Sequence, residues 1–122
     1  MMDTLTALRD AMALVPGVAS CKIGMEANLT PADYPMVRIV PSTVSTGSLN
    51  TRKCEMLIYF GQAIHEFTAG LESLYQNLFD MEADLLAAVR GLNLNAVYVE
   101  TVLDEDRVSA YKLMAIRMVV QG

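Results

Sequence analysis

A metal site or a nucleophilic mechanism in this chain would have to involve its one histidine. His65 is followed by Glu66, and this pair is the beginning of the HExxH zinc motif. The second histidine of that motif is absent, so we interpret the pair as solvent-facing residues that precede a helix. A serine or cysteine nucleophile would need His65 as its base, yet the sequence has no GxSxG turn. The sequence therefore predicts no catalytic residue and no metal site.

The two cysteines give no sign of redox or metal chemistry. Cys21 and Cys54 are not in a CxxC arrangement, and each lies within an apparent strand. Buried reduced thiols are favoured over a disulfide between them, which points to the cytoplasm.

Other ligand-binding signals are also missing. No dinucleotide or P-loop glycine motif occurs, because the seven glycines are dispersed. The acidic runs DMEAD and DEDR contain possible general acids, but Glu82 and Asp84 are two residues apart and do not share a helix face. We interpret most of the nine methionines as core residues rather than as a peptide groove. We predict no cofactor.

Composition narrows the class of protein. The chain has 122 residues, which suits one domain spanning 1–122. Hydrophobic residues make up 53% and charged residues 19%, and part of this apolar excess could form a subunit interface. The net charge of −5 argues against general nucleic-acid binding. No apolar run is long enough for a membrane helix, so we expect no membrane partner.

The residue pattern in the first half of the sequence predicts a helix followed by strands. Leu5, Leu8, Met12 and Val15 repeat at helical spacing, with Asp3 or Thr4 as the N-cap and a Pro-Gly stop at 16–17. Residues 19–26 alternate as a half-buried strand. Prolines 31, 35 and 41 bracket Met36–Val40, which predicts a short strand at the sheet margin. Residues 42–52 are rich in Ser and Thr and predict a long polar loop.

The second half predicts a strand, a long helix and a hairpin. Residues 53–64 place Cys54, Met56, Ile58 and Phe60 on one strand face. A helix is expected from a Thr68 cap through Arg90, with Gly91 as its stop, and its broad apolar stripe should cover a sheet. The runs 95–103 and 108–120 alternate on either side of the charged turn DEDR, which is typical of a hairpin.

These elements predict an α+β domain of order α-β-β-β-α-β-β. About five strands would form an antiparallel or mixed sheet, with the helices packed on one face.

Over its full length the chain resembles the tail terminator (tail completion, minor tail) proteins of long-tailed bacteriophages and prophages. The similarity lies in a first helix ending VPGVAS, the strand YPMVRIVPS with its Ser/Thr/Gly loop, the helix LESLYQNLFDMEADLLAAVRGL and a hairpin ending YKLMAIRMVVQG. The resemblance implies a structural protein without catalytic residues. Its role would be to form a ring, a hexamer by resemblance, on the end of a completed tail tube. That ring stops tail polymerisation and joins the tail to the head.

The partners implied are other copies of the chain, the tail tube protein and the head-side connector. The protein would be found in the virion tail, and in the host cytoplasm during assembly. DNA would pass through the ring without specific binding, for which a lumen lined by Asp104, Glu105 and Asp106 is a hypothesis. A second hypothesis places partner contacts on one polar and basic set: Arg38, Thr46, Ser48, Asn50, Arg52 and Lys53.

The residues alone leave two other classes of function open. A head-completion or neck protein would differ only in the partner that its ring grips. A cytoplasmic regulatory domain that binds a small molecule would need a concave pocket with convergent polar groups, which no motif localises.

Overall fold

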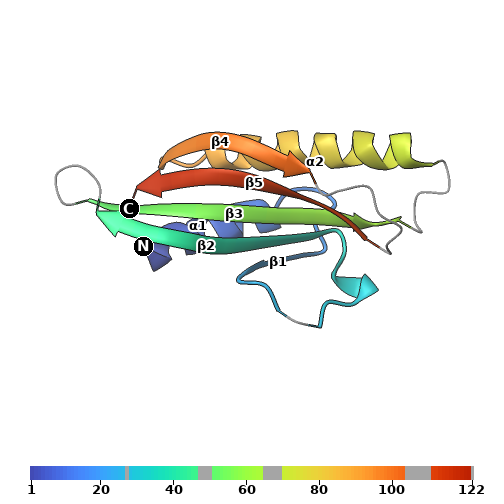
Figure 1. The fold of residues 1–122 in the computed structure, drawn as a ribbon, viewed down its shortest axis with the longest axis horizontal. Coiled ribbons are helices and arrows are strands. Elements are labelled where there is room, and N and C mark those ends of the chain that lie inside the picture. The colour runs from blue at the N-terminus through green and yellow to red at the C-terminus, as the bar shows by residue number, and fades with distance from the viewer. Residues whose placement is uncertain (27, 47–50, 65–69, 104–110, 122) are drawn as a thin grey trace.

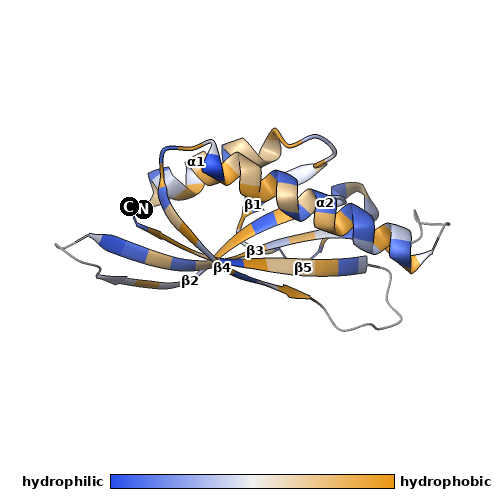
Figure 2. Cartoon of the chain, turned by 90° about the horizontal axis from the view of Figure 1, so that it is seen from above, coloured by the Kyte–Doolittle hydropathy of each residue, from blue (hydrophilic) through white to orange (hydrophobic). Residues whose placement is uncertain are grey.

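The chain folds into one mixed sheet with both helices on the same side (Figures 1 and 2). The computed structural model describes residues 1–26, 28–46, 51–64, 70–103 and 111–121. The five strands are arranged in the order β1-β2-β3-β5-β4. β1 is parallel to β2, and every other neighbouring pair is antiparallel. The predicted α+β class, element order and one-sided helix layer are confirmed.

The bounds of the elements follow the chain in this order: α1 Met2–Ala13, β1 Ser20–Ile23, a short 3-10 turn Pro31–Asp33, β2 Met36–Thr46, β3 Arg52–Ala63, α2 Leu71–Arg90, β4 Asn95–Leu103 and β5 Tyr111–Gln121.

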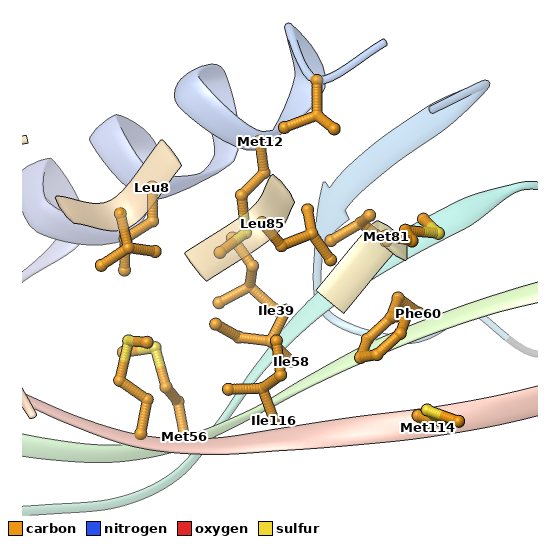
Figure 3. Close-up of a cluster of buried hydrophobic side chains, with 14 of the residues drawn as sticks. Leu8, Met12, Ile39, Met56, Ile58, Phe60, Met81, Leu85, Met114 and Ile116 are labelled. Carbon is orange, nitrogen blue, oxygen red and sulfur yellow. The ribbon is translucent and has the colours of Figure 1, made fainter. Parts of the chain in front are cut away.

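The core lies between the helices and one face of the sheet. On β3, the predicted inward residues Cys54, Met56, Ile58 and Phe60 are all fully buried. Figure 3 shows how side chains from both helices reach this row, with Leu8 and Met12 from α1 and Met81 and Leu85 from α2. The period of two in the strands and the period of about 3.6 in the helices therefore meet in a single apolar layer.

The N-cap residues of both helices differ from those that the sequence predicted. α1 begins at Met2 after an N-cap at Met1, so Asp3 and Thr4 lie within its first turn. α2 begins at Leu71 after Gly70, whose φ is 108°, and Thr68 lies outside the described residues. The left-handed φ of Gly70 turns the chain into the helix without a side-chain cap. The predicted end of α2 at Arg90, with Gly91 following, is confirmed.

The predicted polar loop at 42–52 is wrong for residues 42–46 and for Arg52, which lie in strands, and residues 47–50 lie outside the described residues. β2 continues through Pro41 to Thr46, and β3 begins at Arg52. The two strands pair up to Thr46 and Arg52, with a register shift between Pro41 and Thr43. Ser and Thr side chains can occupy a strand that is exposed on both faces, and threonine is favoured there by its β-branch. The bulge accommodates Pro41, which cannot donate to a ladder.

The prediction that the proline-bracketed strand Met36–Val40 lies at the sheet margin is wrong for Met36–Ile39. Along Met36–Ile39 the strand is interior, because β1 pairs with it there. The last pair between the two strands is Ile23 with Ile39. From Val40 onward, β2 therefore forms the edge of the described sheet.

A second, smaller cluster covers one end of the sheet face that carries no helix. Tyr34 packs there with Met36 and Ala63, and its ring stacks on Tyr111 at a centroid distance of 4.2 Å. The segment that precedes β2 therefore covers this end of the face.

A candidate assembly surface

Three of the residues predicted to contact partners lie together at one end of the β2–β3 hairpin. Thr46 is the last residue of β2 and is paired with Arg52, and the next pair inward is Ser45 with Lys53. Thr46 and Arg52 are exposed, and Lys53 is partly exposed. Ser48 and Asn50 lie outside the described residues. The described part of the set thus places two basic side chains on an exposed hairpin end.

Arg38 does not belong to that surface, which corrects its prediction as a partner contact. Its side chain is fully buried, and its Nη2 donates to Oε1 of Glu26 at 2.7 Å. Its Nη1 donates to Oγ of Ser20 at 3.0 Å and to the carbonyl oxygen of Val37 at 2.8 Å. A guanidinium can be buried only with such partners, so Arg38 ties β1, β2 and the segment after β1 together.

The Arg38 ion pair changes the ionisation of its acidic partner. The hydrogen bonds from the guanidinium lower the pKa of Glu26 below its ordinary value, and Lys22 adds a weaker attraction. Glu26 is therefore charged at neutral pH and compensates the buried cation.

Most of the remaining sequence candidates cannot be placed. His65, Glu66 and the acidic residues Asp104, Glu105 and Asp106 lie outside the described residues. Both cysteines are free thiols, and burial raises the pKa of Cys21 to about 11. Within the described ranges, no group of His, Cys, Asp and Glu is placed to hold a metal ion. None of the described helices is long and apolar enough to cross a membrane.

The most unusual surface is the outer strand β4, which the sequence predictions did not assign to any partner. Val97, Tyr98 and Val99 are 57%, 46% and 50% exposed, and Val102 and Leu103 are 44% and 46% exposed. β4 pairs only with β5 in the described sheet, so its other side is a free edge. Natural edge strands usually carry lysine, proline or little apolar surface, because a free edge invites pairing with another chain.

Charge on this outer strand is locally compensated. Glu100 is the only charged residue of β4, and its Oε1 lies 2.8 Å from Nη1 of Arg117 on β5. Tyr98 and Thr101 share a hydrogen bond of 2.8 Å between their hydroxyl groups. The exposed side chains of β4 therefore present an apolar surface without an uncompensated charge.

From β4 a hollow of mixed polarity extends across the sheet face that has no helix. A register shift between Tyr98 and Glu100 leaves Val99 without a partner on β5. Val99 lines a hollow of about 400 Å³. The other residues of its lining are Ser42, Glu55, Leu57, Arg117 and Val119. This hollow connects the β4 edge to the outer part of β2, so both free edges of the sheet border one uncovered face.

We use the name assembly surface for the exposed apolar residues of β4 together with this hollow. The sequence contained a signal for it, since Val97, Tyr98 and Val99 are three consecutive apolar residues. A strand covered on one face would show polar residues at every second position.

Comparisons with known proteins give no family and a weak structural similarity. No protein-family model matches the chain, and no curated protein matches it. Among solved structures, a chain from the virion of a native gene transfer agent (GTA) particle has a TM-score of 0.47 and 9% sequence identity. The match covers 95% of this chain and 91% of that chain. We therefore base the function on the surfaces of the molecule itself and on the resemblance of its sequence.

Proposed function

We propose that this chain is a structural virion protein that assembles with copies of itself and acts as a tail terminator. In that role it forms a ring on the end of a completed tail tube, stops further polymerisation and presents the surface to which the head is joined. The single observation that carries the proposal is the assembly surface. A free, apolar strand edge next to an uncovered sheet face is a liability in a monomer and is suited to a permanent contact.

The sign of the charge is compatible with this role. A ring that lets DNA pass should not attract phosphates, and the chain carries a net charge of −5. Placing Asp104, Glu105 and Asp106 on the lumen remains a proposal. Changing all three to Lys should slow DNA ejection from assembled particles, and ejection at the wild-type rate would exclude the assignment.

The contact with the tube or the connector is proposed for the β2–β3 hairpin end. Arg52 and Lys53 are consecutive residues of β3 there, so their side chains extend to opposite faces of the hairpin end. A cation on each face suits acidic groups on a neighbouring protein.

The first experiment is sedimentation velocity over a wide range of protein concentration. The proposal predicts a closed oligomer of defined mass, or a monomer that converts to one as the concentration rises. A monomer at every concentration contradicts self-assembly.

A second experiment separates the terminator from a head-completion protein. The chain is added to a tail tube protein during polymerisation, and tube lengths are measured by electron microscopy. A terminator shortens the tubes and is found at their ends. A neck protein leaves tube length unchanged and binds the connector instead.

A further inference from the structure

Apart from the outer side of the short strand β1, the described sheet has two free edges of different kinds on opposite sides. Among the described strands β4 pairs only with β5, so its outer side is free along all nine residues, Asn95–Leu103. On the other side, β1 covers β2 as far as Ile39, and the outer residues Ser42–Thr46 are exposed. A molecule with two different free edges can join its copies head to tail, which is the kind of contact that closes into rings.

The inner limit of the β2 edge is set by Pro41. On the side of β2 that faces β1, the N–H of Ala19 donates to the carbonyl oxygen of Pro35, and the N–H of Gly24 donates to that of Ile39. Both N···O distances are 2.8 Å. Alternation along a strand places Pro41 on this same outer side, where it has no N–H to donate. The outer segment available for pairing is therefore Ser42–Thr46, a length typical of strands in proteins.

The two edges also match in composition and charge. Ser42–Thr46 carries no charged side chain, and its Val44 is 42% exposed. Glu100, the one charge on β4, is paired with Arg117. Both segments contain Val and Thr, which favour cross-strand packing. Since each copy carries a net charge of −5, these neutral edges are the places where two copies can approach with the least repulsion.

We propose that β4 of one copy pairs with the outer Ser42–Thr46 segment of β2 in the next copy. The sheet then continues from copy to copy, and each junction covers the exposed side chains Val97, Val99 and Val44. This inference rests on the proposed self-assembly and names the surfaces that carry it.

The test uses variants in which two lysines on one edge discourage pairing at that edge and leave the other edge unchanged. Val97→Lys/Val99→Lys changes only β4, and Val44→Lys/Thr46→Lys changes only β2. Leu14→Lys/Phe79→Lys is the control, because it adds the same charge at exposed apolar positions of α1's end and of α2, outside both edge strands. Far-UV circular dichroism and thermal melting establish that each variant is folded.

Each edge variant alone should sediment as a monomer at concentrations where the wild type and the control form the closed oligomer. We expect the association to weaken at least tenfold. An equal mixture of the two edge variants should give a species of two chains, because one intact β4 and one intact β2 edge remain in the mixture.

Other outcomes overturn the inference in distinguishable ways. If the wild type and the β4 variant both form the ring, the chain self-assembles but β4 is not the surface that joins the copies. If the β4 variant is a monomer while the β2 variant still assembles, β4 pairs with itself and the head-to-tail arrangement is wrong. If the wild type is a monomer at all concentrations, the inference and the proposed self-assembly fail together.

Discussion

At the scale of single residues, the Arg38–Glu26 pair determines how the first half of the sheet is held. A fully buried guanidinium is tolerated only while its donors are satisfied, and here one carboxylate and oxygens of Ser20 and Val37 satisfy them. Glu26 belongs to none of the strands or helices, so its charge holds the segment after β1 against the sheet.

Glu26→Gln should lower the thermal stability at pH 7. The folded-state pKa of Glu26 is below its ordinary value, so its contribution is present above a pH of about 4.5 and is lost as the pH falls through the folded-state pKa. The difference in melting temperature between wild type and variant should therefore be largest near neutral pH and shrink in acid. Melting curves from pH 3 to pH 8 measure it.

Lys22→Ala is the matched control for that series. Nζ of Lys22 lies 3.7 Å from the same carboxylate, but the lysine side chain is 59% exposed. Exposed pairs contribute little, so its melting temperature should stay near that of the wild type. A constant difference between wild type and Glu26→Gln at every pH would contradict the role of the carboxylate charge.

Gly61 permits a close approach of β3 and β5. A Cβ at this position would contact the Leu113 side chain and would lie 2.7 Å from the carbonyl oxygen of Lys112, which is backbone and cannot rotate away. Gly61→Ala should therefore destabilise the protein by roughly 1–3 kcal/mol, the usual cost of overpacking.

Urea denaturation measures this cost, with Gly91→Ala as the control. A Cβ at Gly91 would be no closer than 3.5 Å to any neighbour, so this variant should change the free energy of unfolding by less than about 0.5 kcal/mol. Equal stabilities for the two variants would show that β5 shifts to make room at position 61.

The burial of Arg38 could not be read from the sequence. An arginine in an apolar strand flanked by prolines is usually solvated, and only the fold brings Glu26 and Ser20 next to it. Cys54 and Phe60 were predictable, in contrast, because alternation alone fixes the face of a strand on which each residue lies.

At the scale of elements, α2 is stable because one of its faces covers the sheet. Leu74, Leu78 and Leu85 are fully buried, and Leu71 is 53% exposed. Leu85→Ala should lower the free energy of unfolding by roughly 2–5 kcal/mol, because it removes apolar contacts and leaves a cavity. Leu71→Ala should cost less than about 0.5 kcal/mol. Chemical denaturation of both variants checks the difference, and similar values would mean that α2 contributes no core.

Periodic elements could be predicted and the exposed end of the β2–β3 hairpin could not. The apolar steps of α2 and the alternation of β3, β4 and β5 result from burial of one face, which leaves a pattern in the sequence. Residues 42–46 are exposed on both faces, so no apolar alternation marks them as strand. They are held by pairing with β3, and backbone pairing leaves little trace in the order of side chains.

At the scale of the whole molecule, the proposed pairing edges are separated from most of the charge. Ser42–Thr46 carries no charged side chain and the one charge of β4 is paired with Arg117, while the chain as a whole is acidic. The sequence shows an excess of apolar residues, but it does not show where they are exposed. The location depends on the strand order, which makes β4 rather than β5 the outer strand.

This separation predicts how self-association depends on salt. Two copies with a net charge of −5 each repel one another, while the proposed edges carry no uncompensated charge. Salt screens the repulsion and leaves apolar contacts intact, because the screening length falls from about 14 Å at 50 mM to about 4 Å at 500 mM ionic strength. Association measured by sedimentation should therefore become tighter as sodium chloride is raised over this range.

The opposite result would locate the contact elsewhere on the molecule. If Arg52 and Lys53 met acidic groups of a second copy, added salt would weaken the association, since attraction between exposed opposite charges is screened in the same way. The variant Arg52→Ala/Lys53→Ala sharpens the distinction. It raises the net negative charge of each copy, so edge pairing predicts somewhat weaker association at low salt and wild-type association at high salt. Loss of association at both salt concentrations would mean that these two residues, rather than the strand edges, join the copies.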